Sequence, residues 1–252
     1  MKVTLTRITK DPILAIEEAA SNCYDSVATG DGKIMKHCIK SGHASVTEFC
    51  DFTFHIEGIS RALSHQLVRH RIASYAQRSQ RYCSEDGFEY VTPKTITNAE
   101  NPTAEVLYKN MMKNITTCYK LLQELGIPNE DARMVLPNAC TTQIEVKMNL
   151  RTLMNFMNER LCTCAQWEIR EMARMMRDEV LKEVPQLKDY LVPKCEKYGK
   201  EFGFCTETKQ RREALKCNRH PRLADIFEDY HNYKDMCESE WRRKFIYMEQ
   251  EI

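Results

Sequence analysis

Residues 69–82 read RHRIASYAQRSQRY, a stretch with four arginines and a histidine but no carboxylate. The acid-free window around it extends from Gly58 to Ser84, in a chain that is 29% charged with a net charge of only +1. A guanidinium group can form two parallel hydrogen bonds to a phosphate or a carboxylate. Arginines without a local counter-charge therefore indicate that a bound anion supplies the missing negative charge. The alternative is a solvated cationic face, or arginines that pair with acids elsewhere in the fold.

The composition limits the classes of protein to consider. A chain of 252 residues can bury one sizeable core with a small appendage. The near-neutral charge argues against a general nucleic-acid coat, so anion binding is expected to be local. The N-terminal residues contain no apolar signal region and no apolar run approaches a membrane span, which favours a cytoplasmic protein without a membrane partner. The twelve cysteines lack the spacing of a secreted disulfide scaffold and are expected to be free thiols.

Hydrophobic periodicity predicts an α+β fold, a small sheet packed with long helices. We expect helices at residues 12–21, 33–41, 60–69, 101–126, 149–161 and 165–184, and a polar loop at 43–48. Alternating residues predict strands at 52–56 (ended by Gly58), 88–92 and 144–148. The apolar face of the helix from residue 101 is expected to contain Val106, Leu107, Met111, Ile115, Tyr119 and Leu122.

The helix from Asn149 carries a polar stripe beside its apolar face. Arg151, Asn155, Asn158 and Cys162 follow one another at helical spacing. Amides and an arginine in line can hydrogen-bond a heterocycle or a ribose, but the same spacing also fits an ordinary solvated flank. Arg160 points to the opposite edge of the helix and would serve a different group.

The composition changes beyond about residue 190, where lysine, arginine and glutamate dominate. We expect residues 191–252 to form an appendage, with a helix at 226–248, that packs on the domain or on a neighbouring subunit. Cys195, Cys205, Cys217 and His220 lie in this segment, but no close cysteine pair is among them. Their spacing gives weak support for zinc, and no metal site is predicted. Neither a phosphate loop nor a G-x-G-x-x-G dinucleotide motif is present.

The arginine stretch resembles the defining motif of the flavin-dependent thymidylate synthases, in which Arg-His-Arg is followed after seven residues by Ser and then by an Arg two residues on. Three further segments resemble the same family in the same order. They are Gly42–Glu48 with Phe52–His55, Ala132–Pro137, and Asn149–Phe156 running on to Arg160 and Ala165–Glu168. The resemblance covers roughly residues 10–185, and four motifs in order are far more specific than one.

This resemblance implies an enzyme that reductively methylates dUMP to dTMP. Members of the family use FAD, with NADPH as the reductant and methylenetetrahydrofolate as the one-carbon donor. They are homotetramers whose active sites lie at subunit interfaces. Residues 1–190 would form the catalytic domain. The alternative is a non-catalytic nucleotide- or RNA-binding protein that uses the same arginine loop, although an RNA binder should show a wider basic face.

The resemblance also assigns roles to individual residues. The cofactor-binding residues would be Ser45 (from a neighbouring subunit), Arg69, His70, Arg71, Gln77, Asn149, Leu150, Arg151 and Asn155, with His43 and Glu48 nearby. The dUMP-binding residues would be Gln66, Leu67, Val68, Arg69, Gln77, Arg78, Ser79, Gln80, Arg81, Arg133 and Arg160. Arg160 would be catalytic, because a guanidinium at the pyrimidine edge stabilises negative charge on the uracil ring.

Ser79, Cys164 and Gln77 each have a feature that bears on the role implied by the resemblance. Ser79 has no evident general base beside it in the sequence, so we interpret it as a nucleotide contact and not as a covalent nucleophile. Cys164 stands where some members of the family have a flavin-contacting histidine, and Gln77 where some have glutamate. The motif itself divides in two: Arg69–Arg71 would face the flavin and Gln77–Arg81 the nucleotide.

Overall fold

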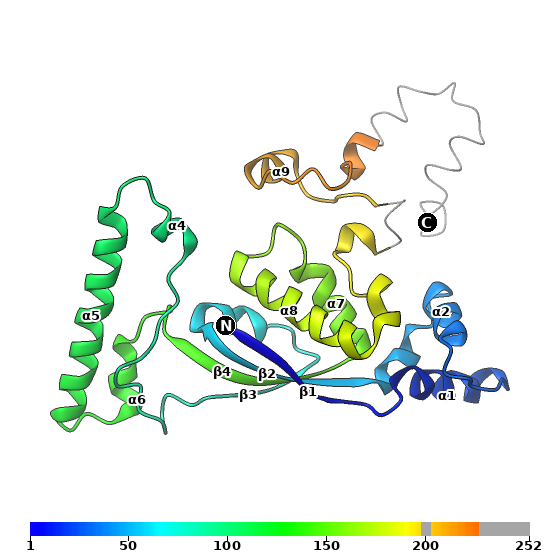
Figure 1. Cartoon of the computed structure of the whole chain (residues 1–252), viewed down its shortest axis with the longest axis horizontal. Coiled ribbons are helices and arrows are strands. Elements are labelled where there is room, and N and C mark those ends of the chain that lie inside the picture. The colour runs from blue at the N-terminus through cyan, green and yellow to red at the C-terminus, as the bar shows by residue number, and fades with distance from the viewer. Residues whose placement is uncertain (198–202, 227–252) are drawn as a thin grey trace. The chain divides into compact units, whose positions relative to one another are not determined.

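The computed structural model of the chain describes residues 1–197 and 203–226. Contacts within the chain group it into two compact units. The first contains Met1–Ile8 and Asp51–Met148, and the second contains Thr9–Cys50 and the described residues from Asn149 onward. Figure 1 labels the elements of both units. The predicted division of the chain at residue 190 stays a prediction.

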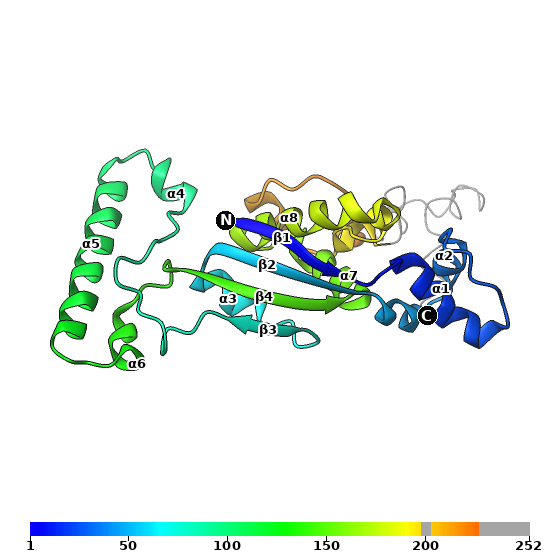
Figure 2. The same ribbon diagram turned by 60° about the horizontal axis from the view of Figure 1, so that its bottom comes forward.

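The first unit is built on a four-stranded sheet with the strand order β1-β2-β4-β3, which Figure 2 shows. The strands are β1 (Lys2–Ile8), β2 (Asp51–Ser60), β3 (Ser74–Gln77) and β4 (Thr141–Asn149). β1 pairs antiparallel with β2, and β3 pairs antiparallel with β4. Along β4 the buried residues alternate with exposed or half-buried ones, because successive side chains of a strand point to opposite faces.

Four helices and a 3₁₀ turn complete the first unit. They are α3 (Arg61–Leu67), α4 (Lys94–Thr97), α5 (Thr103–Glu124), α6 (Asn129–Ala132) and the 3₁₀ turn η2 (Arg133–Val135). α5 packs against α4, α6 and η2. A small core of Phe88, Met112 and Cys140, with Tyr90 and Tyr108 packed on it, joins α5 to the segments that flank β4.

The second unit is helical. Its α-helices are α1 (Pro12–Tyr24), α2 (Lys33–Lys40), α7 (Leu150–Arg160), α8 (Trp167–Glu183) and α9 (Lys209–Ala214). Its 3₁₀ turns are η1 (Ala44–Phe49), η3 (Pro185–Asp189) and η4 (Lys194–Glu196). α7 packs against η1, α8 and η4, while α1 packs against α2 and η1. The fully buried Glu17 carboxylate accepts hydrogen bonds from the backbone N–H groups of Thr29, Gly30 and Ile34, which fixes the α1–α2 connection.

The α+β fold and most of the predicted elements are confirmed. Ser60 accepts a hydrogen bond from Leu63 N at 3.0 Å and caps α3, and Asn149 caps α7 in the same way through Thr152 N at 2.9 Å. Both are the cap residues that the sequence predicts, because a side-chain oxygen at this position satisfies a free N–H of the first turn.

Several local predictions are wrong. Residues 88–92 form no strand, and only Tyr90 makes an isolated bridge, to Cys140. Gly58 does not end β2, because it adopts a φ of +69° and the strand continues to Ser60. A Cβ at this glycine would lie 3.1 Å from Met1 N, so the close approach also requires it. Residues 44–49, expected as a loop, form η1.

The predicted inner face of α5 is only partly confirmed. Tyr119 is buried and Ile115 packs on the core, as predicted, but Val106, Leu107 and Met111 are at least half exposed and Met112 is buried instead. α5 is apolar on more than one side, so the sequence alone does not decide which side meets the core. The strands β1 and β3 were not predicted, and the helix expected at 226–248 lies outside the described residues except for Ile226.

Candidate active site

Helix α3 positions the start of the arginine motif. Leu63 and Leu67 are fully buried and fix this short helix in the first unit, so Gln66 is half-buried while Val68 and Arg69 are exposed. The buried Leu67 side chain leaves only its backbone for a ligand. The helix ends at Leu67, and the chain turns immediately before Arg69.

The turn that carries Arg69, His70 and Arg71 is closed by Tyr75. The Tyr75 hydroxyl lies 2.9 Å from the carbonyl oxygen of Leu67 and 2.8 Å from that of His70. Arg69 and Arg71 are exposed, and neither side chain forms an ion pair or a hydrogen bond with any residue that the structure describes. The fold therefore holds the backbone of this turn while leaving two guanidinium groups open to an anion.

Strand β3 fixes the middle of the motif. Tyr75 lies opposite Val146 and Gln77 opposite Ile144 in the pairing with β4. The side-chain amide of Gln77 donates to Ser64 Oγ at 2.9 Å and to Thr142 Oγ1 at 3.3 Å. Its nitrogen thus ties β3 to α3 and β4, so only the carbonyl oxygen of the Gln77 amide remains for a ligand.

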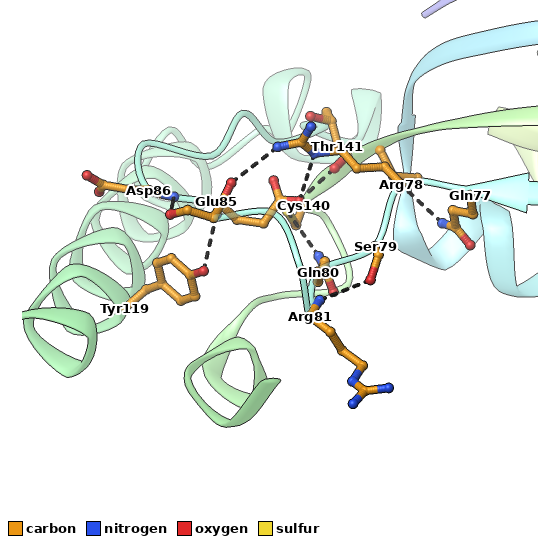
Figure 3. Close-up of polar contacts among 12 residues, drawn as sticks. Gln77, Arg78, Ser79, Gln80, Arg81, Glu85, Asp86, Tyr119, Cys140 and Thr141 are labelled. Carbon is orange, nitrogen blue, oxygen red and sulfur yellow. Dashed lines mark hydrogen bonds and ion pairs between the residues drawn. The ribbon is translucent and has the colours of Figure 1, made fainter. Parts of the chain in front are cut away.

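Figure 3 shows how the loop after β3 is held. Arg78 Nε lies 3.0 Å from Glu85 Oε1, and this carboxylate, whose side chain is only 10% exposed, raises the pKa of the Arg78 guanidinium. The backbone N–H of Glu85 donates to the hydroxyl of the fully buried Tyr119 at 3.1 Å. These contacts hold Arg78 within its own loop, so its guanidinium is less available to a ligand than the sequence suggested.

The other loop residues have different surroundings. Gln80 is buried, with its amide nitrogen 3.8 Å from the sulfur of Cys140, and burial raises the pKa of that thiol to about 11. Ser79 Oγ accepts a hydrogen bond from Arg81 N at 3.2 Å, and no histidine or carboxylate of the described chain is hydrogen-bonded to it. This geometry agrees with a binding role for Ser79.

Two of the loop amides are already used. Arg78 N donates to Gln143 O at 3.0 Å, and Arg81 N donates to Ser79 Oγ. The N–H groups of Ser79 and Gln80 have no hydrogen-bond partner in the described chain. They are the amides that remain for a phosphate.

Arg81 and Arg133 meet at the same acidic residue. Arg81 Nη2 lies 2.8 Å from Glu130 Oε2, and Arg133 Nε donates to the backbone oxygen of Glu130 at 3.1 Å. The Arg81 and Glu130 side chains are 51% and 49% exposed, so this ion pair is weak and can be exchanged for another anion. The Arg81 guanidinium also lies 5.5 Å from the centre of the Tyr82 ring.

A second group of predicted site residues lies in the second unit. Arg151 Nη1 forms an ion pair with Glu48 Oε1 at 2.6 Å, joining α7 to η1. Ser45 and Asn155 are exposed, and Asn149 uses its side-chain oxygen to cap α7. Leu150 is fully buried and its N–H donates to Cys50 O at 2.7 Å, which leaves its side chain unavailable. Arg160 is the last residue of α7.

The structure thus brings the predicted residues together in two groups, one in each unit. It also identifies residues that the sequence reasoning missed: Tyr75, Glu85, Tyr119 and Glu130, which hold the motif in place. Tyr75 lies within the motif, in β3, where it is half-buried. Glu85 lies only seven residues after its partner Arg78, whereas Tyr119 and Glu130 are distant in sequence from Glu85 and Arg81 and give no sequence signal.

Comparisons with known proteins show the family of this chain. A family model described as "Thymidylate synthase complementing protein" matches residues 4–186. A flavin-dependent thymidylate synthase of Nitratidesulfovibrio vulgaris is 37% identical over an alignment of 243 residues, and the match covers 87% of this chain and 95% of that protein. This chain belongs to the flavin-dependent thymidylate synthase family.

Other members of the family and a solved structure extend the likeness. The flavin-dependent thymidylate synthase of Geobacter sulfurreducens is 44% identical over 185 residues, covering 69% of this chain and 79% of that protein. A crystal structure of the Helicobacter pylori flavin-dependent thymidylate synthase, described as complexed with FAD and dUMP, superposes with a TM-score of 0.62. It is 26% identical, and the match covers 76% of this chain and all of that one.

Membership of the flavin-dependent thymidylate synthase family confirms the resemblance, the enzyme class and the fold class predicted from the sequence. The family match ends at residue 186, close to the predicted end of the catalytic domain. Among the described residues, no helix is long and apolar enough to span a membrane. The roles of individual residues stay predictions.

Proposed function

We propose that this protein methylates dUMP reductively to dTMP in the cytoplasm, with FAD as the bound cofactor. NADPH is the reductant and methylenetetrahydrofolate the carbon donor. The observation that carries the proposal is the acid-free arginine motif, whose Arg69 and Arg71 stay unpaired in the described structure of a thymidylate synthase family member. The Helicobacter pylori relative with FAD and dUMP supports the choice of ligands.

The residues present fit a flavin dinucleotide. Its diphosphate is an anion that needs forked cations, and the exposed Arg69 and Arg71 have no carboxylate partner in the described chain. In the second unit, Ser45, Arg151 and Asn155 offer hydroxyl, guanidinium and amide donors, and Arg151 is pre-positioned by Glu48. When bound, the flavin supplies hydride transfer, while the protein supplies binding and orientation.

The phosphate of dUMP would bind the loop after β3. Arg81 would exchange its exposed partner Glu130 for the phosphate, and the free N–H groups of Ser79 and Gln80 would complete the contact. Gln77 would use its remaining carbonyl oxygen, and Arg133, tied to Glu130 O, would stand beside Arg81. Ser79 would bind and not attack, because it has no general base among its hydrogen-bond partners.

Arg160 would act on the uracil ring. Carbon 5 of uracil is a poor nucleophile until negative charge builds on the ring. A guanidinium stays protonated throughout, so Arg160 would stabilise that charge without giving up a proton. Arg160 lies at the end of α7, so the packing of that helix fixes the backbone of Arg160.

We also propose a homotetramer with the active sites at subunit interfaces. Ile72, Tyr82 and Met134, which directly follow Arg71, Arg81 and Arg133 in the sequence, are each at least 77% exposed. Large exposed apolar side chains next to predicted ligand-binding residues fit a surface that another subunit covers.

The experiment is to purify the full-length protein and measure its flavin spectrum, NADPH oxidation and dTMP formation with dUMP and methylenetetrahydrofolate. Arg160→Ala should abolish dTMP formation while FAD remains bound. Arg174→Ala, at an exposed arginine of α8, is the matched control and should leave turnover unchanged. A colourless protein that binds no added FAD and forms no dTMP would refute the proposal.

A further inference from the structure

A small cavity in the second unit is lined by sulfur. Its lining includes Cys162, Cys164, Cys195, Cys205, Cys217 and His220, and its volume is about 20 Å³. The proposed thymidylate synthase reaction uses none of these residues. Eleven cysteines of the described chain are free, and five of them converge here.

Four separate segments bring the thiols together. Cys162 and Cys164 lie in the turn between α7 and α8, and Cys195 lies in η4. Cys205 is fixed by two backbone hydrogen bonds of 2.8 Å, from its own N–H to Pro221 O and from Leu223 N–H to its carbonyl. Cys217 follows α9, so the cavity is closed by segments that are distant in sequence.

The turn from Cys217 to His220 is itself held in place. Arg212 donates to the carbonyl oxygens of Cys217 and His220, at 3.2 and 2.6 Å. The ring of His220 packs against Gly203, where any Cβ would lie 2.4 Å from a ring atom. A glycine is therefore required for the histidine to reach the cavity wall.

Two buried polar atoms at this cavity are left without a hydrogen bond. In the described chain, Thr163 Oγ1 and His220 Nε2 are the buried side-chain nitrogen and oxygen atoms with no hydrogen-bond partner, and both residues line the cavity. An unsatisfied buried polar group is costly, so Thr163 Oγ1 at this cavity indicates that a ligand is missing, whereas His220 Nε2 already faces Glu196 Oε1 at 3.5 Å. The ligating atoms of Cys195, Glu196 and His220 lie within 4.8 Å of one another, as do those of Cys162, Cys164 and Glu207. No three of the sulfur atoms of Cys162, Cys195, Cys205 and Cys217 form such a group in the described chain, so a bound ion has to draw these thiols closer together.

We propose that this cavity binds one zinc ion through the thiolates of Cys162, Cys195, Cys205 and Cys217. Zinc prefers four tetrahedral ligands in structural sites, and soft thiolates select it over magnesium or calcium. A cavity of about 20 Å³ has room for one ion and not for a cluster of several irons. On binding, the four thiols release four protons to solvent and the site carries a net charge of −2.

The positions of the cysteines in the chain explain why these four are proposed as the ligands. Each of the four segments supplies one thiol. Cys162 is 9% exposed, whereas Cys164 is half-buried beside Glu207.

The rest of the lining suits a negatively charged zinc–thiolate centre. Lys194, Arg212 and Arg219 also line the cavity, where Lys194 and Arg219 offset the charges of Glu207 and Glu196. Thr163 O–H would donate a hydrogen bond to a bound sulfur, which accounts for its lack of a partner, and His220 lies beside Glu196 at the cavity wall. Because Cys162 lies two residues after Arg160, the ion would join the end of α7 to the C-terminal extension.

The test is elemental analysis of the purified full-length protein, after removal of any affinity tag. We expect one zinc per chain. Cys195→Ser and Cys205→Ser should each lower the zinc content at least tenfold. Cys118→Ser and Cys23→Ser, at exposed cysteines, and Cys164→Ser should keep it. His220→Ala should keep zinc but lose about 10- to 100-fold in affinity in a competition titration with a chromogenic chelator.

A second measurement covers variants that fail to fold. Removing the metal from the wild-type protein with a chelator should lower its melting temperature, and adding zinc alone should restore it. A metal-free wild-type protein that binds no added zinc, stoichiometric iron in place of zinc, or disulfides among these cysteines would each overturn the proposal. Loss of zinc in Cys164→Ser would overturn the ligand assignment. None of these readouts depends on thymidylate synthase activity.

Discussion

Replacing Arg81 by alanine should weaken dUMP far more than it weakens FAD. A charge-assisted hydrogen bond to a phosphate contributes about 1.5–3 kcal/mol. Before dUMP binds, Arg81 must leave Glu130, and because both side chains are about half exposed that ion pair contributes only ~0.2–1 kcal/mol. The net loss is then about 0.5–2.8 kcal/mol, a roughly 2- to 100-fold weaker dUMP complex.

Replacing Glu130 should change the affinity for dUMP in the opposite direction. Glu130→Gln removes the anion that competes with the phosphate for Arg81, so dUMP should bind up to about fivefold more tightly. Arg71→Ala should chiefly weaken FAD, because Arg71 has no partner in the described chain and lies in the other half of the motif.

The assay is calorimetric titration of dUMP into the FAD-loaded protein, together with fluorescence titration of FAD into the apoprotein. Arg174→Ala, distant in sequence from both halves of the motif, should change neither constant. If Arg71→Ala and Arg81→Ala weakened both ligands equally, the motif would not divide into a flavin half and a nucleotide half. If Glu130→Gln weakened dUMP, Glu130 would be orienting Arg81 and not competing for it.

Three further changes test other parts of the structure. Ser79→Ala should retain substantial turnover with a weaker dUMP complex, and complete loss of chemistry with dUMP still bound would show covalent catalysis. Tyr119→Phe should lower the free energy of unfolding by about 1–3 kcal/mol in denaturant titrations, because the Glu85 N–H loses its acceptor; an unchanged value would mean that water replaces the hydroxyl. The hydrogen bond to Glu145 at 2.7 Å raises the pKa of His55, so its stabilisation is complete below about pH 6.5 and is lost as the pH rises through the raised pKa. The melting temperature of His55→Gln should therefore fall furthest below wild type at low pH, and a constant difference across pH would contradict this.

What the sequence could predict depended on whether the signal was local. The strand at 144–148 was predictable because its buried residues alternate, and the caps Ser60 and Asn149 because a cap acts within one helical turn. Strand β3 was not, since Ser74–Gln77 has no apolar alternation and becomes a strand only by pairing with β4. Residues 88–92 alternate convincingly, yet their backbone makes only the bridge at Tyr90 because their side chains pack on α5.

The candidate site shows the same difference between local signals and contacts that form only in the fold. The residue types were predictable, because forked cations without local acids indicate an anionic ligand wherever the chain places them. Which of those cations remain available was not, because it depends on contacts that form only in the fold. Arg78 is held by Glu85 while Arg81 is only loosely held by Glu130, and the difference in the exposure of the two carboxylates leaves Arg81 the more available of the two to a ligand.

The cysteines show most clearly that a site built from distant segments cannot be predicted from the spacing within one segment. Their spacing gave weak support for zinc because no two thiols of the C-terminal segment are close in sequence. Cys162 belongs to the catalytic segment, so no inspection of residues 191–252 alone could have completed a set of four with one thiol from each segment. The fold supplies that residue and leaves the buried Thr163 hydroxyl at the same cavity without a hydrogen bond. With zinc bound, the division at residue 190 is a boundary of composition and not of structure, because the end of α7 and the extension share one metal centre.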